Sequence, residues 1–229
     1  MKAAVIVFPA SNCDRDVKEA LERTPGVEPV MVWHKSTELP KVDLIVIPGG
    51  FAFGDYLRAG AMAAHAPVMY EVRRRAERGT PVLGICNGFQ VLTEAGMLPG
   101  AFLQNDCLKF VAKDVFLKVE TSQSIFTNKY EAGQTLRIPI AHHEGNYYAD
   151  EETLQRLEEN GQIAFRYCTD AGEVTPEANP NGAARNIAGI FNESKTILGL
   201  MPHPERLADA ALGGTDGKAI FSALAEALS

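Results

Sequence analysis

Residues 82–90 read VLGICNGFQ, and this stretch decides the fold class. An apolar run leads directly into G-x-C-x-G centred on Cys86, and a helical pattern follows over 87–95. This order of strand, sharp turn and helix is the cysteine version of a nucleophile elbow. Gly84 and Gly88 remove side chains that would collide as the chain doubles back. The elbow predicts an exposed, strained cysteine at a helix N-terminus, where the dipole favours the thiolate. The alternative is a buried structural cysteine beside a tight turn.

Strand and helix patterns alternate on both sides of the elbow. In the first half we expect strands at 3–8, 29–33, 44–47 and 81–85, and helices at 14–23, 67–78 and 87–95. Such βα units predict a parallel sheet with helices on both faces. From 108 to 140 the pattern changes to extended segments, followed by expected strands at 163–167, 186–190 and 197–200 and a helix at 216–228. We therefore expect a three-layer α/β fold, mostly parallel, with a mixed or antiparallel extension in the second half. The length predicts a single domain, 1–229.

The composition excludes several classes of protein. Lysine plus arginine is 22 and aspartate plus glutamate is 29, so the formal charge is −7, which is unlike a nucleic-acid-binding protein. A hydrophobic share of 46% argues against wholesale disorder. No apolar run approaches the roughly 20 residues of a membrane helix. The apolar start, 3–8, is too short for a signal peptide and stops at Pro9. We expect a cytoplasmic protein.

The chain has four cysteines, and none of them forms a C-x-x-C pair typical of a metal or redox site. We expect no disulfides in a cytoplasmic protein of this size. Cys86 is the candidate nucleophile because of the elbow. We expect Cys13, Cys107 and Cys168 to be inert. Cys13 follows the first strand, so a position near the cleft is an open alternative for this residue.

The second informative segment, MPHPE at 201–205, follows the strand expected at 197–200. His203 at the end of that strand is a candidate base for Cys86, and Glu205 is a candidate to orient the imidazole. The long separation from Cys86 is no objection, because triads assemble in space. The alternative is a solvated loop with an incidental histidine.

The third segment, LIVIPGGF at 44–51, ends a strand in Pro-Gly-Gly. Ligands of parallel sheets bind outside the carboxyl ends of the strands. Free glycine N–H groups there are candidates for an oxyanion donor, beside the N–H of Asn87. Gln90 lies about one turn further along the elbow helix, on the same face as Cys86. The alternative for Gly-Gly is an ordinary turn after a strand.

Two other stretches resemble ligand-binding motifs, but neither predicts a site. GGTDGKA at 213–219 is not a phosphate-binding loop, since that pattern needs glycine at Leu212 and serine or threonine at Ala219. Adjacent residues of an extended segment point to opposite faces, so His142, His143 and Glu144 do not predict a metal site. We expect them in a loop near the active site or a partner interface, and we predict no metal ligands.

The three segments together resemble the class I, triad-type glutamine amidotransferases. Further stretches resemble, within that family, the glutaminase subunits of phosphoribosylformylglycinamidine synthases. They are ASNCDRD (10–16), GFAFGDYLRAG (50–60), AHHEGNY (141–147), NPNG (179–182) and GLMPHPER (199–206). The resemblance covers essentially the whole chain. It departs at Ala10, where the family more often has glycine, and this position has no catalytic role.

The resemblance implies a flavodoxin-like fold and a glutaminase site. Cysteine attack on the side-chain amide of glutamine would form a γ-glutamyl thioester, which water would hydrolyse. The implied site residues are the catalytic Cys86, His203 and Glu205, the oxyanion donors Gly50 and Asn87, and the substrate-binding Gly49, Phe51 and Gln90.

The resemblance also implies partners. Ammonia would pass to an ATP-dependent synthetase subunit that converts formylglycinamide ribonucleotide into formylglycinamidine ribonucleotide in de novo purine biosynthesis. We expect no cofactor in this chain, with ATP and magnesium on the synthetase, a small accessory subunit in the assembly, and weak activity of the free chain.

Three alternatives stay open at this point. The first is another cysteine hydrolase, such as a γ-glutamyl hydrolase or a peptidase relative. The second is a scaffold without activity, which the presence of Cys86, His203 and Glu205 disfavours. The third is the glutaminase domain of a synthase that makes GMP, carbamoyl phosphate or CTP. A rise in activity on adding a partner would separate the first from the leading hypothesis.

Overall fold

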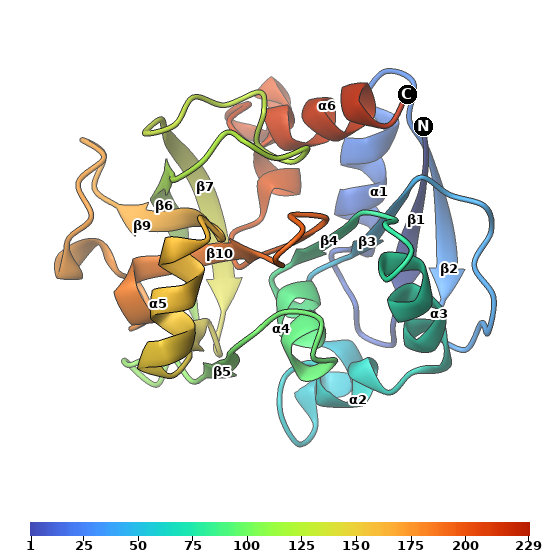
Figure 1. The fold of residues 1–229 in the computed structure, drawn as a ribbon, viewed down its shortest axis with the longest axis horizontal. Helices are drawn as coiled ribbons and strands as arrows, with labels where there is room; N and C mark the ends of the chain where they lie inside the picture. Colours follow the sequence, from blue (N-terminus) through green and yellow to red (C-terminus); the bar gives the residue numbers. More distant parts are fainter.

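The computed structural model describes all residues, 1–229, and is built on a nine-stranded sheet in the order β2-β1-β3-β4-β11-β10-β9-β6-β7 (Figure 1). Its strands are β1 (Lys2–Val7), β2 (Glu28–Trp33), β3 (Leu44–Ile47), β4 (Val82–Ile85), β6 (Val111–Val119), β7 (Thr135–His142), β9 (Ile163–Cys168), β10 (Ile187–Phe191) and β11 (Ile197–Leu200). A separate two-stranded sheet pairs β5 (Ala101–Leu103) with β8 (Asn146–Tyr148).

Helices cover this sheet on both faces. The α-helices are α1 (Asp14–Glu22), α2 (Ala61–Ala64), α3 (Pro67–Ala76), α4 (Asn87–Glu94), α5 (Glu151–Glu159) and α6 (Lys218–Ala227). Short 3₁₀ segments are Ala52–Asp55, Pro176–Ala178, Ala184–Asn186, Pro204–Leu207 and Ala210–Leu212. Figure 1 shows α1 and α6 on one side of the parallel strands and α2, α3 and α4 on the other. None of the helices has the length and apolar character needed to cross a membrane.

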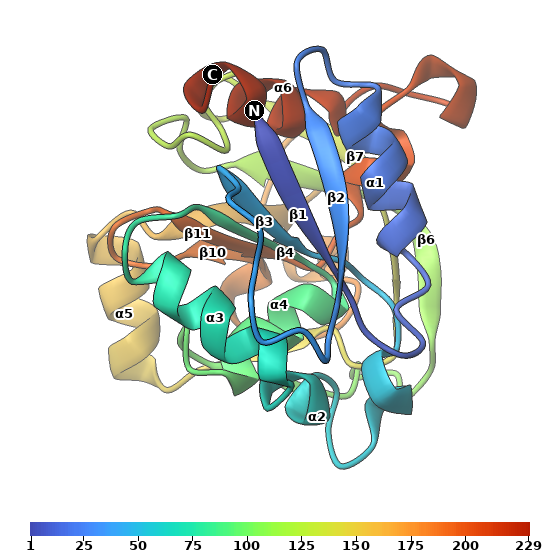
Figure 2. The same ribbon diagram turned by 90° about the vertical axis from the view of Figure 1, so that its right-hand side faces the viewer.

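Strands β2, β1, β3, β4 and β11 pair in parallel (Figure 2). Every residue of β3, β4 and β11 is buried, because a sheet with helices on both faces has no solvated side. Since these strands run in the same direction, the loops that follow β1, β3, β4 and β11 emerge at one edge of the sheet. The three segments singled out in the sequence all lie in those loops.

The remaining strands extend the sheet in antiparallel pairs from β11 through β10, β9 and β6 to β7. Alternate residues of β7 are buried, as expected for a strand with one face against the core. The three-layer fold and the antiparallel extension of the second half are confirmed. The expected strands and helices lie within two residues of the observed ones.

Helix α5 was not predicted from the sequence. Asp150 caps it, with a side-chain oxygen accepting from the N–H of Thr153 at 2.7 Å. Leu154 and Leu157 are its buried residues, three apart on one face. The capping aspartate and this apolar pair are the local signal for the helix.

Candidate active site

The elbow is present as a sharp turn between β4 and α4. Cys86 is the residue between them, with φ 51° and ψ −109°. A positive φ is costly for a residue with a side chain and persists where the surroundings impose it. A side chain on Gly84 would collide with the backbone of Gly88, and one on Gly88 would collide with the carbonyl of Ile47. Both glycines are therefore required for the turn.

The Cys86 side chain is buried, with 4% exposure, and not exposed as the elbow predicts. The end of β7 lies beside it, and the thiol is 3.8 Å from the carbonyl oxygen of Ala141. A cavity of about 210 Å³ lies beside it, lined also by Gly50, Phe51 and Gln90. The buried nucleophile thus lies at the wall of a small, partly open pocket.

The loop after β11 brings His203 to the same edge of the sheet. Its Nδ1 lies 2.7 Å from Oε1 of Glu205, and the two side chains are 2% and 0% exposed. Burial by itself lowers the pKa of His203, but Glu205, Cys86 and Cys13 outweigh it and raise that pKa well above the ordinary value. The Nε2 atom is buried without a hydrogen-bond partner. Glu205 therefore fixes the imidazole at Nδ1, and Nε2 has no hydrogen-bond partner in the protein.

Gly49 is the point at which these groups meet. A Cβ atom there would lie 2.7 Å from Cε1 of His203, 3.3 Å from Cβ of Cys86 and 3.3 Å from Sγ of Cys13. Cys86 and His203, 117 residues apart in the chain, pack against the same glycine. Because Gly49 has no side chain, Cys86 and His203 can pack this close to it.

The two residues after Gly49 form a wall of the cavity. Gly50 has φ +134°, and a Cβ there would lie 2.6 Å from the backbone nitrogen of Asn12. The N–H of Phe51 donates to the carbonyl of Ala10 at 3.0 Å, so it is engaged within the chain. The N–H of Gly50 is thus the better oxyanion candidate of the two.

Asn87 and Gln90 connect helix α4 to the loops around the cavity. The side chain of Asn87 accepts from the N–H of Ala52 at 3.0 Å and donates to Oε1 of Gln90 at 2.9 Å. Gln90 in turn donates to the carbonyl of Glu144 at 2.6 Å. These bonds fix the segments after β3 and β7 against the helix that begins at the nucleophile.

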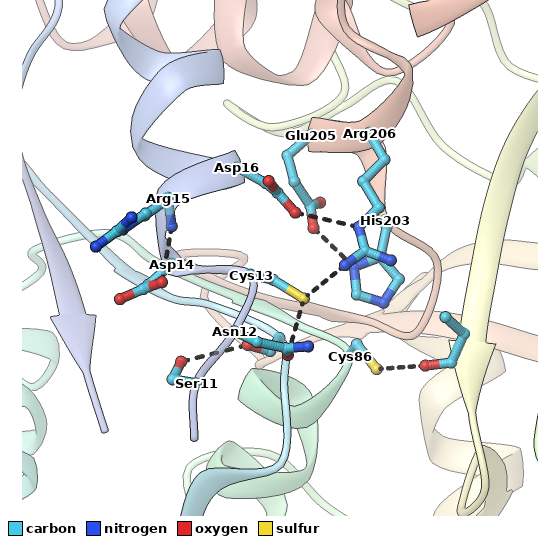
Figure 3. Close-up of polar contacts among 12 residues, drawn as sticks. Ser11, Asn12, Cys13, Asp14, Arg15, Asp16, Cys86, His203, Glu205 and Arg206 are labelled. Atoms are coloured by element: carbon cyan, nitrogen blue, oxygen red, sulfur yellow. Dashed lines mark hydrogen bonds and ion pairs between the residues drawn. The ribbon is translucent and has the colours of Figure 1, made fainter. Parts of the chain in front are cut away.

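Cys13 and Arg206 belong to this site, although the sequence did not establish it. Cys13 is buried, and its sulfur accepts from Nη2 of Arg206 at 3.1 Å (Figure 3). Possible ligand atoms of Cys13, His203 and Glu205 lie within 4.8 Å of one another, which is close enough for a shared metal ion. The signal for Cys13 was its place after β1, whose carboxyl end lies at the same edge.

The His142–Glu144 segment forms another wall of the Cys86 cavity, as expected for a loop near the active site. His142 is buried, with Nδ1 3.1 Å from Oδ1 of Asn105 and Nε2 3.4 Å from Nδ2 of Asn181. Burial, with a smaller contribution from His203, lowers the pKa of His142 to about 4. His142 is therefore uncharged near neutral pH, and its contacts with Asn105 and Asn181 anchor the 142–144 segment to the protein interior.

A buried cysteine on a strand–helix elbow, beside a buried histidine–glutamate pair from the neighbouring strand, defines a class of α/β proteins with a cysteine–histidine–glutamate triad. Comparison with known proteins narrows that class. Residues 1–213 match the model of the CobB/CobQ-like glutamine amidotransferase domain.

Relatives match over the full length. Two proteins named phosphoribosylformylglycinamidine synthase subunit PurQ are 56% identical (Rhodopseudomonas palustris) and 57% identical (Roseobacter denitrificans), each match covering 100% of this chain and 99% of the relative. A solved structure of PurLQS from Thermotoga maritima is 44% identical, with a TM-score of 0.88, covering 100% of this chain and 99% of that one. The chain belongs to this PurQ family of glutamine amidotransferases.

Proposed function

We propose that this chain is the glutaminase subunit of a phosphoribosylformylglycinamidine synthase. It hydrolyses the side-chain amide of glutamine and supplies ammonia to the synthetase that converts formylglycinamide ribonucleotide into formylglycinamidine ribonucleotide in purine (IMP) biosynthesis. Full-length relatives of more than 50% identity carry this synthase's name. The observation that carries the proposal is the buried His203–Glu205 pair packed, with Cys86, around Gly49.

In the first half-reaction the Cys86 thiolate attacks the amide carbon of glutamine and a carbon–sulfur bond forms. The N–H groups of Gly50 and Asn87 stabilise the oxyanion. When the intermediate collapses, the carbon–nitrogen bond breaks and the leaving nitrogen takes a proton from Nε2 of His203. Ammonia and a γ-glutamyl thioester on Cys86 result.

In the second half-reaction a water molecule attacks the thioester carbon and gives a proton to Nε2 of His203. The carbon–sulfur bond breaks, glutamate leaves, and the cysteine–histidine pair is restored. Glu205 supports both steps, because a carboxylate at Nδ1 directs Nε2 toward the reacting atoms and stabilises the imidazolium. The raised pKa of His203 supports this role.

Gly49, Phe51 and Gln90 form the glutamine-binding walls in this proposal. Phe51 and Gln90 line the cavity next to Cys86. Gly49 contributes by being small, since any side chain would displace His203. We propose no metal ion in the catalytic step.

The synthetase and a small accessory subunit are the proposed partners. The Thermotoga maritima relative was solved as PurLQS, whose name joins two further subunits to Q. ATP and magnesium belong, in this proposal, to the synthetase. In this proposal the chain works as a single domain, 1–229, in the cytoplasm, together with the synthetase that uses the nucleotide substrates.

The test is ammonia release from glutamine by the purified chain, alone and with the synthetase and accessory subunits and their nucleotides. The proposal expects weak release alone, strong release in the complex, and none with Cys86→Ala. Strong release without partners would favour a free-standing hydrolase. No release in either setting from folded protein would overturn the proposal.

A further inference from the structure

A second buried thiol, that of Cys13, lies beside the histidine and the glutamate of the triad. Cys13 comes from the loop after β1, whereas His203 and Glu205 come from the loop after β11. Their side chains converge in Figure 3, and possible ligand atoms of the three buried residues lie within 4.8 Å of one another. We call these three residues the Cys13 cluster. Cys86 does not belong to this group of possible ligands.

Two atoms of the Cys13 cluster lack a partner in the protein. Nε2 of His203 and Oε2 of Glu205 are buried and make no hydrogen bond. Because Nδ1 of His203 contacts Oε1 of Glu205 at 2.7 Å, a neutral imidazole carries its proton on Nδ1 and a lone pair on Nε2. A buried polar atom without a partner costs free energy, which a bound cation would recover.

The three kinds of donor in the Cys13 cluster point to zinc. Sulfur, imidazole nitrogen and carboxylate oxygen are the ligands of Zn²⁺, whereas Mg²⁺ and Ca²⁺ take oxygen ligands. Ligand atoms around a tetrahedral zinc ion lie roughly 3.3–3.6 Å apart, so movements of about 1 Å would close this cluster on one ion. A cavity of about 90 Å³, lined by Cys13 and His203, has room for a water molecule as the fourth ligand.

Arg206 competes with a metal ion for the sulfur of Cys13. Its Nη2 donates to that sulfur at 3.1 Å, and its Nε donates to Oδ2 of Asp16 at 3.3 Å. The side chains of Arg206 and Asp16 are 35% and 44% exposed, so the ion pair between them is weak. Arg206 also lines a second cavity, of about 140 Å³, with Asp16 and Glu205. The guanidinium therefore has room to leave the sulfur when a divalent cation replaces it.

We propose that Cys13, His203 and Glu205 form an inhibitory zinc site. On binding, the thiol of Cys13 releases its proton, and the neutral imidazole and the carboxylate each donate a lone pair, so no group is oxidised or reduced. A metal ion on His203 prevents this base from exchanging protons with the substrate. Zinc therefore stops glutamine hydrolysis reversibly without binding the nucleophile. The inhibition rests on the proposed glutaminase function, whereas the binding of zinc does not.

The first test measures zinc binding to the purified chain by competition with a chromophoric chelator. Cys13→Ala should bind zinc about 100-fold more weakly than the wild type, because losing even a group that only supports a metal ligand costs 10- to 100-fold. Cys13→Ser, which keeps the size of the side chain but offers a hydroxyl group, should show a similar loss. Cys86→Ala should bind zinc as tightly as the wild type.

Two further measurements identify the thiol ligand. Co²⁺ in place of zinc should give a sulfur-to-cobalt charge-transfer band in Cys86→Ala and no such band in Cys13→Ala. The matched control is Cys107→Ala, which removes an exposed thiol and should leave zinc binding unchanged. A thermal melt of each variant shows whether it is folded.

Arg206→Gln tests the competition in the opposite direction. This variant removes the cation that contacts the Cys13 sulfur. Zinc should then bind about tenfold more tightly than in the wild type, as expected when one competing charged contact is lost. A merely structural role of Cys13 and Arg206 predicts weaker binding in the variants of both residues.

Ammonia release from glutamine by the complete complex measures the inhibition. Zinc should inhibit the wild type and Cys107→Ala alike, and Mg²⁺ should not replace it. Cys13→Ala should need about 100-fold more zinc for the same fractional loss of its own activity. The same complex supplied with ammonium chloride instead of glutamine reports any effect of zinc on the synthetase, and the inhibition is expressed relative to that control.

Zinc binding that is lost in Cys86→Ala and kept in Cys13→Ala would overturn the inference, because the nucleophile would then be the ligand. Equal binding by all variants, or no binding at micromolar zinc, would overturn it as well. Zinc bound through Cys13 without loss of ammonia release would reject the inhibitory role. A wild-type complex that releases no ammonia in the absence of zinc would reject the proposed function, and the binding measurements would then decide the zinc site alone.

Discussion

Nδ1 of His203 lies 2.7 Å from Oε1 of Glu205, and this contact leaves Nε2 as the one ring nitrogen able to exchange a proton with a substrate. The backbone supports the arrangement, because the N–H of His203 donates to the carbonyl of Pro139 on β7 at 2.8 Å. The antiparallel extension thus positions the base that serves a nucleophile on the parallel half.

Replacing Glu205 by glutamine should lower the pKa of His203. Burial already lowers this pKa, and the Glu205 carboxylate that raises it would be absent. The imidazolium should then lose its proton at a lower pH than in the wild type, and kcat should fall roughly 10²- to 10⁴-fold. NMR titration of the His203 ring measures the shift, with the exposed His65 as an internal reference. An unchanged or higher midpoint would contradict the role of Glu205.

Gly49→Ala should impair catalysis without unfolding the protein. The added methyl group would lie 2.7 Å from the His203 ring, so the imidazole has to move. A displacement of about 1 Å in a catalytic group can cost 10²-fold in rate, and we expect a loss of kcat of about that size. Steady-state kinetics and a thermal melt measure the two effects.

The matched control is Gly79→Ala, at a glycine with φ +90° and no atom near the added methyl group. This change should destabilise the fold by about 1 kcal/mol and leave kcat unaltered. A Gly49→Ala enzyme with wild-type kcat would show that the packing at this glycine does not position His203.

Cys13→Ala should distinguish the two buried thiols of the site. Cys13 is the residue before α1, and its sulfur contacts Arg206 and lies within 4.8 Å of a ring nitrogen of His203, whereas Cys86 is the residue on the elbow. We expect kcat to fall less than about tenfold, since the nucleophile and its base remain. Ammonia release by the variant measures this. A loss as complete as that of Cys86→Ala would mean that Cys13 takes part in the chemistry.

Local patterns in the sequence predicted most of the fold and the positions of the triad residues. The all-apolar strands β3, β4 and β11 are clear in the sequence because both of their faces are buried. The elbow and the MPHPE segment were recognisable from their positions at strand ends. Helix α5 was missed because its short apolar face, Leu154 and Leu157, is weak without its packing partners.

Long-range contacts were the part that the sequence did not predict. The thiol of Cys86 contacts Ala141 on β7, which is the edge strand of the sheet and is distant from the elbow in the sequence. Likewise, Asp55 and Glu144 meet only because loops after β3 and β7 converge. Neither residue has a neighbour in the sequence that signals the pairing.

Asp55→Asn should stabilise the unliganded protein at neutral pH. Because the pKa of Asp55 is about 6 when folded and about 3.8 otherwise, the folded state binds more protons between these values. Wild-type stability therefore falls as pH rises through that range. A shift of two units corresponds to roughly 3 kcal/mol, and partial exposure of this side chain reduces it to about 1–2 kcal/mol.

Urea denaturation at pH 8 and pH 3.5 measures this effect. The variant should be more stable than the wild type at pH 8, and most of the difference should disappear at pH 3.5, where Asp55 is protonated in the folded state and largely protonated in the unfolded state. A variant that is less stable than the wild type at pH 8 would show that the charged Asp55 carboxylate does not destabilise the folded protein.

The proposed reaction passes through a covalent γ-glutamyl thioester on Cys86. Rapid acid quenching of the complex during turnover of glutamine, followed by peptide mass spectrometry, detects this intermediate. We expect a γ-glutamyl group on the peptide that contains Cys86, absent in Cys86→Ala and reduced in His203→Asn, because His203 also protonates the leaving nitrogen. A modification on Cys13, or turnover with no modified cysteine, would contradict it.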